Sequence, residues 1–440
     1  MTKYTRLFIT FLLAAIAFGA KAQSTATTSS PYSKYGLGDI TPGYLPQNIG
    51  MGGISTAINK INFYNNINPL NPASYGAINL TTIDVGIYSN IVNLSQAGQK
   101  ASDANFRLSH VAFAVPITKR SAISFGLLPY SEMGYNYKQT LSRGYTGKGV
   151  DTNATNYVYN GDGGLSKAYF GYGFGIGKHF LIGGNVSYIF GNLQQFSSTE
   201  IPSLYGTLNS RVEQSNAIGG ANFDYGAQYS FDFGDQSDKH LVLGYSASAK
   251  SSINSTNTYI VSQYSIDANG VANTAADSVI SIVGGKTKIQ LPQVNHFGIS
   301  FQNDGHFIIG ADYSIGHWSA FTVSGANAGF QDSKTLNVGG EFTPNINALH
   351  NYFARVDYRL GFIYDQSYLN ISNTNINRTA LTFGLGLPLS PNLTTFYKIN
   401  FSAELGQRGT TANGLVKENY VNLHLSFVLN DKWFQRYKFE

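Results

Sequence analysis

His424 and Ser426 lie two residues apart near the C-terminus, in the order His-Leu-Ser. In a β-strand, residues i and i+2 point to the same face, and a serine beside a histidine is a pair that nucleophilic hydrolysis uses. Polar residues are also expected on such a face without any catalysis, and no Asn-Gly follows the serine. We therefore predict that the protein is not an enzyme. A phospholipase, which would lose its activity in Ser426→Ala, is the alternative.

Other motifs that could support chemistry are incomplete. The eight histidines show neither HExxH nor clustered spacing, so no metal site is predicted. Residues 284–287 (GGKT) end like a phosphate-binding loop, but Ile280 stands where the first glycine belongs. The absence of cysteine excludes disulfides, a thiol nucleophile and Cys-ligated zinc. We expect no cofactor, and because the net charge of +5 is spread along the chain, no nucleic acid partner.

The composition is unusual for a soluble enzyme. The 440 residues include 48 glycines, 30 tyrosines and 29 phenylalanines, and only 12% are charged, against roughly 25% in ordinary soluble domains. A soluble chain of this length would divide into domains of about 150 residues, yet no linker or charge block interrupts the chain after residue 80. One large repetitive architecture is therefore predicted.

Residues 1–22 have the features of a cleaved secretory signal peptide. Lys3 and Arg6 form a basic start, residues 7–18 are largely apolar, and small residues precede a predicted cut at Gln23. The alternative is an N-terminal membrane anchor, but the apolar run is shorter than the ~20 residues that cross a bilayer. An exported chain with no later helical span is periplasmic, secreted, or a β-barrel in the outer membrane.

Apolar and polar residues alternate along many segments from residue 80 onward. Residues 222–233 (NFDYGAQYSFDF) show this period of two, which is typical of a strand with one apolar face. Fourteen strands are predicted, at residues 80–89, 106–116, 121–139, 165–177, 180–194, 215–233, 240–252, 292–302, 306–317, 335–343, 351–365, 377–387, 395–406 and 419–429.

The links between these strands alternate in length. Tight links follow the even-numbered strands, and links of roughly ten to forty residues follow the odd-numbered ones, which is typical of outer-membrane barrels with short periplasmic turns and long external loops. The predicted fold is therefore all-β, a 14-stranded antiparallel transmembrane β-barrel (residues 80–429) in the cell outer membrane. An even strand number places both termini in the periplasm. A soluble all-β adhesin is the alternative.

The third predicted strand contains Pro129, with Met133 and Gly134 soon after. Proline cannot donate a hydrogen bond to a neighbouring strand, so the sheet is expected to bulge or open there. We predict a lateral opening in the barrel wall at these three residues. The alternative is that the strand ends at Leu128 and that Pro129 lies in an external loop.

Residues 23–79 differ from the rest by their glycines, prolines and short apolar patches. The lumen of fourteen strands is wider than the one that side chains fill in an eight-stranded barrel, so we predict that this segment forms a hatch or plug inside it. Glycines would let its backbone pass close to the wall. A disordered periplasmic tail is the alternative, although the segment is more apolar than a solvated tail.

Several short motifs, taken in order, resemble the FadL family (FadL/TodX) of outer-membrane channels for long-chain fatty acids and other hydrophobic compounds. Six residues resemble the hatch of that family: Gly50, Gly52, Gly53, Asn71, Pro72 and Ala73. Three barrel positions lie in segments that resemble its strand, turn, strand signature: Pro292, Asp312 and Trp318. Residues 355–365 (RVDYRLGFIYD) resemble the strand that follows, so the resemblance touches most of the mature chain.

The resemblance implies an N-terminal hatch, a kinked third strand that opens sideways, and external substrate-collecting loops, here residues 195–214 and 253–290. It implies passive uptake of a hydrophobic small molecule by a barrel surrounded by membrane lipid and lipopolysaccharide. The loop at 253–290 is polar over its first half, and residues 430–440 form an extra tail, expected in the periplasm. The alternative function is a structural subunit of an outer-membrane secretion or assembly machine, with other outer-membrane or periplasmic proteins as partners.

Overall fold

The computed structural model describes most of the chain after residue 27. The described residues are 28–61, 64–141, 153–204, 206–233, 238–267, 271, 273, 277–348, 350–389 and 396–432. The predicted signal peptide and residues 433–440 of the predicted tail lie outside them. Among the described residues, no helix has both the length and the apolar character needed to cross a membrane.

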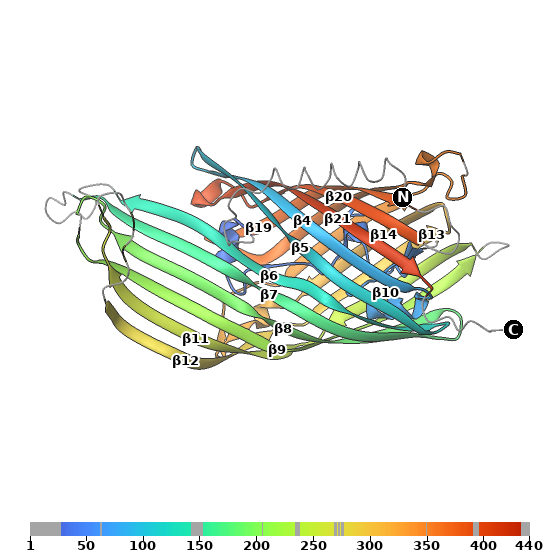
Figure 1. Cartoon of the computed structure of the whole chain (residues 1–440), viewed down its shortest axis with the longest axis horizontal. Helices are drawn as coiled ribbons and strands as arrows, with labels where there is room; N and C mark the ends of the chain where they lie inside the picture. Colours follow the sequence, from blue (N-terminus) through green and yellow to red (C-terminus); the bar gives the residue numbers. More distant parts are fainter. Residues whose placement is uncertain are drawn as a thin grey trace, which may run out of the picture.

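Antiparallel strands form a closed barrel (Figure 1). Its strands are β4 (Thr81–Gln96), β5 (Gln99–Thr118), β6 (Ser121–Leu141), β7 (Thr155–Ile176), β8 (Phe180–Glu200), β9 (Asn209–Phe233), β10 (Lys239–Ser248), β11 (Ser251–Tyr264), β12 (Asp277–Leu291), β13 (Val294–Asn303), β14 (Phe307–Gly316), β17 (Ser333–Phe342), β18 (Asp357–Ile371), β19 (Thr374–Pro388), β20 (Phe396–Arg408) and β21 (Lys417–Asp431). Strands β10 and β11 both pair with β9, so they are two parts of one interrupted strand. Strand β13 pairs with β10 and β12 pairs with β11, so β12 and β13 are likewise two parts of one interrupted strand. Because β21 pairs with β4, fourteen strands close the barrel, and the predicted fold class is confirmed.

Every predicted strand overlaps an observed one, but many strands are longer than predicted at one end of the barrel. We call the end that holds Thr81 and Asp431 the proximal end, and the opposite end the distal end. At the distal end β4 joins β5 through a turn of Ala97 and Gly98, both with positive φ, where the sequence predicts a link over residues 90–105. The predicted contrast between tight proximal links and long distal ones is therefore weaker than expected.

The two predicted substrate-collecting loops require a correction. Residues 195–214 are mostly strand, because β8 continues to Glu200 and β9 begins at Asn209. Residues 253–290 are largely β11 and β12. A strand that extends beyond lipid needs no apolar outer face, so the alternation that predicts half-buried strands fades there.

Short elements occupy three other links. The link from β14 to β17 contains η3 (Trp318–Ala320), β15 (Thr322–Val323) and β16 (Ala326–Asn327). The 3-10 turn η4 (Phe353–Arg355) precedes β18, which therefore begins later than the predicted residue 351, and η5 (Ala412–Gly414) lies between β20 and β21.

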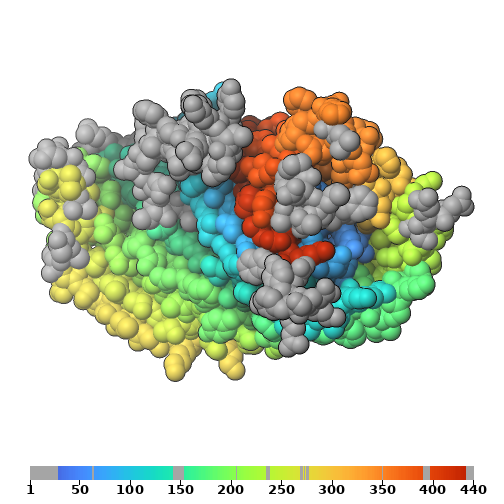
Figure 2. Space-filling view, turned by 45° about the vertical axis from the view of Figure 1, so that its right-hand side comes forward, coloured from blue at the N-terminus to red at the C-terminus, as the bar shows by residue number. Residues whose placement is uncertain are grey.

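The N-terminal segment lies against the inner face of the barrel. It consists of η1 (Pro31–Lys34), β1 (Asp39–Ile40), α2 (Pro46–Ile49), β2 (Lys60–Ile61), β3 (Tyr64–Asn65) and η2 (Pro72–Ala77). Helix α2 contacts β19 and β20, whereas η2 contacts β7, β8 and β9 on another side of the lumen. Blue N-terminal residues show between the strands in Figure 1 and again among the strands in Figure 2. The segment therefore spans the lumen.

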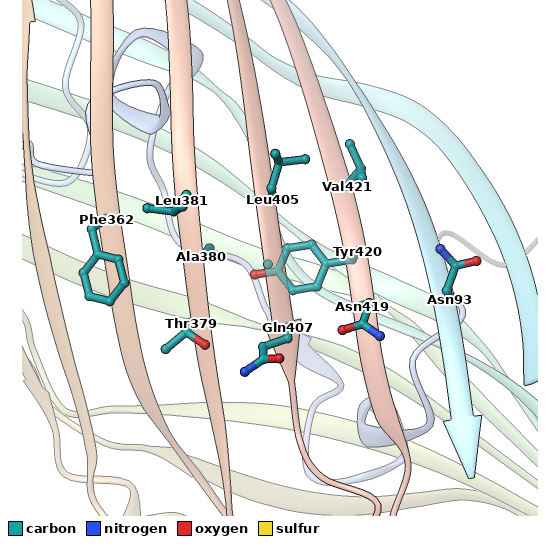
Figure 3. A pocket seen from close by; sticks show the side chains of 11 residues that line it. Asn93, Phe362, Thr379, Ala380, Leu381, Leu405, Gln407, Asn419, Tyr420 and Val421 are labelled. Carbon is teal, nitrogen blue, oxygen red and sulfur yellow. The ribbon is translucent and has the colours of Figure 1, made fainter. Parts of the chain in front are cut away.

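The outward-facing side chains form a belt of exposed apolar residues, such as Phe170, Phe223 and Leu360. Figure 3 shows the distal edge of this belt, at a shallow groove of about 430 Å³ across β18 to β21 and β4. One row of side chains there is apolar and the next distal row is polar: Phe362, Leu381, Leu405 and Val421 are followed by Thr379, Gln407, Asn419 and Asn93. Such a belt is typical of a transmembrane barrel.

Candidate functional site

The hatch-like glycines lie where the N-terminal backbone meets the inner wall. Gly52 has φ +73°, and a Cβ there would lie 2.6 Å from the carbonyl oxygen of Val338, so this position requires glycine. Its N–H donates to Thr382 Oγ1 at 2.9 Å, and Thr382 donates to the carbonyl of Gly50 at 3.2 Å. Gly53 lies beside Tyr44 and Asn337. Backbone thus packs directly on wall backbone at Gly52, and on side chains at Gly53.

Asp312 on β14 attaches the next part of the segment to the wall. Its Oδ2 accepts the backbone N–H groups of Ser55 at 2.8 Å and Thr56 at 2.7 Å. Nearby, Asn337 Nδ2 donates to the hydroxyl of Tyr44 at 2.9 Å. Burial, together with Asp312, raises the pKa of Tyr44 well above its ordinary value, so this hydroxyl is neutral.

Asn71, Pro72 and Ala73 form the start of η2. The side chain of Asn71 accepts the N–H of Ala73 at 3.2 Å and donates to the carbonyl of Thr56 at 2.7 Å. The carbonyl of Pro72 lies against Gly173 on β7 and Gly183 on β8, where a Cβ would come within 2.4 and 2.3 Å of it. The sequence motif and these wall glycines therefore fit one another, although they lie about 100 residues apart, a spacing that no local pattern encodes.

The ladder between β5 and β6 stops halfway along the wall. The two strands pair from Thr118 and Ser121 only as far as Val111 and Leu127. Strand β6 continues to Leu141 and stays paired with β7, with a register shift between Pro129 and Ser131. Figure 1 shows the β4–β5 hairpin diverging from β6 above this point. Pro129 therefore lies inside a strand and not in a loop, at the base of a gap in the wall.

Residues 28–41, which we call the N-terminal strap, cover the free edge of β6 from inside. Asp39 pairs with Glu132 and Ile40 with Ser131, and the N–H of Thr41 donates to the carbonyl of Tyr130 at 3.0 Å. These bonds replace part of those that β5 would supply, along the stretch of β6 next to Pro129.

Gly134 and Met133 hold the next part of the strap. Ser33 Oγ accepts the N–H of Gly134 at 3.0 Å and donates to its carbonyl at 3.1 Å. A Cβ on Gly134 would lie 1.8 Å from the carbonyl oxygen of Thr28, so only glycine lets the strap approach this closely. The side chain of Met133 is buried in an apolar cluster with Tyr32 and Leu37 of the strap.

An ion pair crosses the gap. Arg107 on β5 pairs with Glu132 on β6, and its guanidinium lies 4.4 Å from the ring centre of Tyr88. Both charged side chains are mostly buried. On the strap side, Asn105 Nδ2 donates to Ser29 Oγ at 3.2 Å, and Ser29 donates to Asp103. Side chains, and not backbone, therefore connect β5 to β6 here.

A cavity of about 340 Å³ lies in the lumen next to the gap. Leu128 and Pro129 line it on the wall side. Its lining also includes charged residues of the strap and of several strands: Asp39, Arg107, Glu132, Arg378, Glu404, Arg408 and Glu418. Arg408 bonds Asp39 at 2.8 Å, and Glu418 accepts from Ser30 at 2.6 Å, so these charges also hold the strap.

An apolar cluster fills the lumen distal to the cavity. Trp318 of η3 stacks on Tyr368 with 4.4 Å between ring centres, and Tyr32 and Leu37 of the strap belong to the same cluster. Pro292 lies in the break between β12 and β13, away from Asp312 on β14. The three family-motif positions therefore have different roles: a strand break, an anchor for the N-terminal segment, and a packing residue.

His424 and Ser426 do not form a bonded pair in the structure. Both side chains are buried on the inner face of β21, and neither ring nitrogen of His424 nor Ser426 Oγ has a hydrogen-bond partner among the described residues. The ring of His424 packs against Tyr88 at 4.8 Å. Nothing in this geometry activates the serine as a nucleophile. The described residues also contain no cluster of His, Asp and Glu that could hold a metal.

A buried charge cluster at the proximal end was missed by the sequence analysis. Arg359 donates to Glu341 at 2.7 Å and to Asp357 at 3.2 Å, and Lys398 donates to Asp357. Lys398 also lies 3.5 Å from the ring centre of Tyr64 in the N-terminal segment. Charged residues at inward positions of otherwise apolar strands were the available signal. Their pairing, however, connects three strands and cannot be read from the sequence.

Comparison with solved structures shows the same fold in two toluene transporters and a FadL homologue. TodX, the toluene transporter of Pseudomonas putida, is 16% identical, with 90% of this chain and 99% of that chain covered and a TM-score of 0.57. TbuX, the toluene transporter of Ralstonia pickettii, is 17% identical over 88% and 98% of the chains, with a TM-score of 0.57. A Pseudomonas aeruginosa FadL homologue is 14% identical over 90% and 100%, with a TM-score of 0.53.

These likenesses establish the class of the fold, a FadL-like barrel, and the resemblance predicted from the sequence is confirmed at that level. The BamG family model matches residues 1–440, so the chain belongs to the BamG family. A comparison with curated proteins finds no match.

Proposed function

We propose that the protein is an outer-membrane channel for passive uptake of small hydrophobic molecules, long-chain fatty acids among them, with lateral exit through the wall. The observation that carries the proposal is the interrupted β5–β6 ladder, which opens beside the lumen cavity and is covered only by the strap among the described residues. The toluene transporters TodX and TbuX, which share the fold, support the class of ligand.

The apolar belt gives the barrel its place in the membrane. Lipid and lipopolysaccharide would cover its exposed aromatic and aliphatic side chains, and the proximal end, which holds Asp431 of the last strand, would face the periplasm. An apolar ligand gains about 25 cal/mol for each Å² of surface that leaves water. No energy source is therefore needed for it to enter the distal apolar cluster or to leave sideways into lipid.

The route requires a movement of the strap. In the structure, Tyr32 and Leu37 of the strap fill the apolar cluster, and β1 occupies the edge of β6. We propose Gly50, Gly52, Gly53, Asn71, Pro72 and Ala73 as the residues that fix the hatch to the wall. Pro129, Met133 and Gly134 would form the rim of the lateral opening. Ligand binding would then shift the population toward a displaced strap.

A disulfide lock tests this route, because the chain has no cysteine of its own. Ile40 and Ser131 are direct partners across β1 and β6, a spacing that suits a disulfide between neighbouring strands. The double variant Ile40→Cys/Ser131→Cys should lose uptake of a labelled long-chain fatty acid and of a labelled monoaromatic hydrocarbon when oxidised, and regain it when reduced. Each single variant is the control, and full uptake by the oxidised lock would exclude lateral exit past the strap.

A structural subunit of an outer-membrane secretion or assembly machine is the second candidate. It is favoured by the distal extension of the wall from β6 to β12, which carries exposed apolar residues outside the lipid belt. Purification in mild detergent separates the candidates. Stoichiometric protein partners would favour the subunit, and a solitary barrel with copurified lipid would favour the channel.

A further inference from the structure

Strand β12 has one free edge at the distal end. Its other edge pairs with β11 from Asp277 to Leu291. On the free side, β15 pairs only with Ile289 and Gln290, and Ser324 bonds the carbonyl of Lys288. Among the described residues, no strand is paired with residues 277–287 on this side. A row of backbone donors and acceptors is therefore available there.

The same stretch exposes apolar side chains where no lipid explains them. Ile282 lies opposite Tyr259 and Ile280 opposite Val261, so the four side chains share one face. Ile282 is 56% and Val283 72% exposed. The polar distal end of β13 begins at Asn295. At about 3.3 Å per residue, on the order of 40 Å of strand separates Ile282 from Asn295. These residues therefore project beyond the apolar belt.

Free edges of this composition pair with other chains unless something protects them. Residues 278–283 (SVISIV) are apolar or small, uncharged and free of proline, which is the composition that favours strand addition. Protection consists of Asp277 and Lys286, one near each end of the edge, and of two register shifts, one near Gly284, which has φ +78°, and one between Ile280 and Ser278. We propose that this edge, residues 277–287 of β12, binds an extended segment of a different polypeptide at the distal end of the barrel.

A second copy of the chain cannot supply this strand in a regular ladder. Two barrels in one membrane point the same way, so a twofold axis between them runs along the membrane normal. Strands of such barrels tilt by roughly 35–45° from that normal, and rotation about it reverses the tilt. The two copies of β12 would then cross at roughly 70–90° instead of lying side by side.

The edge also defines the chemistry of the partner. Main-chain hydrogen bonds would supply affinity, and side chains at alternate positions would supply specificity. Apolar residues at every second position would cover Ile280 and Ile282. A carboxylate farther along would meet Lys286, which lies on the same stretch.

Hydrogen exchange of the backbone amides tests the proposal directly. The full-length protein would be purified from its own cells in mild detergent, and amide exchange of residues 277–287 would be followed before and after the partner is removed with a harsher detergent. We expect at least tenfold slower exchange while a stoichiometric partner is bound. The double variant Ile280→Lys/Ile282→Lys should lose both the partner and the protection.

The control is Leu208→Lys, which adds a lysine at an exposed leucine in the distal link between β8 and β9. It should keep the partner and the slow exchange. The proposal is overturned if residues 277–287 exchange equally fast in both preparations, or if they remain protected in the isolated barrel, because the chain then covers its own edge. A protected homodimer without a second polypeptide would overturn it as well.

Discussion

In the distal half of this barrel, the edges of β5, β6 and β12 lack a full neighbouring strand, and among the described residues the N-terminal segment pairs with only one of them, β6. The edge of β6 is covered by the N-terminal strap, which pairs with it through Asp39 and Ile40 and packs on Gly134. The edge of β12 has no such cover among the described residues. The first edge is therefore suited to open and close within one molecule, and the second to bind another molecule.

The composition of the two edges agrees with this difference. Around the β6 edge, the sequence supplies Pro129, which cannot donate to a ladder, and charged residues that pair across the gap. Residues 278–283 of β12 have no proline and no charge. An edge that its own chain covers needs features that keep other strands away, whereas an edge that recruits a partner must remain competent to pair.

The largest effect is expected for Glu132→Ala, because it leaves the buried guanidinium of Arg107 unpaired beside the gap. Loss of one partner of a buried pair costs about 3–5 kcal/mol, so the strap should detach and the barrel should unfold at a lower temperature. The gel shift of the folded barrel on heating measures this. Arg107→Met/Glu132→Met is the control, since removal of both charges should restore most of the stability; equal losses in both variants would assign the effect to packing.

A smaller effect is expected for Gly134→Val, which would place a side chain against the carbonyl of Thr28. Overpacking of this kind costs about 1–3 kcal/mol, or roughly 5- to 150-fold in the equilibrium of the strap. Amide exchange of residues 28–40 should rise accordingly, while residues 277–287 should not change. Gly184→Val is the control, because the nearest atom to a Cβ there is 3.5 Å away. A strap that stays protected in Gly134→Val would contradict the close approach.

The smallest effect is expected for Pro129→Val, which restores a backbone donor at the base of the gap. The β5–β6 ladder already stops at Leu127 and the register shift follows Pro129, so one donor should narrow the opening without closing it. We expect uptake of a labelled fatty acid to fall by a few-fold at most, with unchanged heat stability. Unchanged uptake would count against lateral exit at this residue.

Much of the fold was predictable from the sequence. Alternation in segments such as residues 222–233 indicates strands with one apolar face, and fourteen of them with alternating link lengths indicate a membrane barrel. The distal extensions of β8, β9, β11 and β12 were not predictable, because outside lipid both faces of a strand can be polar. The free edge of β12 was not predictable either, because residues 278–283 are largely apolar without a strict alternation, and no local pattern shows that a neighbouring strand is missing.

The candidate site was predictable only in part. Pro129 and Gly134 marked an irregular strand, and the glycines and Asn-Pro-Ala of the N-terminal segment marked a backbone that packs closely on something. Their contacts could not be predicted. Asp312 meets Ser55 and Thr56 from a distant part of the chain, while the pairs Arg107–Glu132 and Arg359–Glu341 depend on how neighbouring strands are arranged, which no local pattern sets.

The sequence by itself determined which residues face lipid and which face inward, because a side-chain period of two is a local property of each strand. It also determined that one strand cannot be regular, because proline lacks a backbone donor. Only the tertiary structure decided where the β5–β6 ladder stops, what covers part of the edge it leaves, and that no described strand pairs with residues 277–287 on the free side of β12. Strand pairing can join residues as far apart in the chain as those of β4 and β21, and no local sequence pattern shows which strand lacks a neighbouring strand.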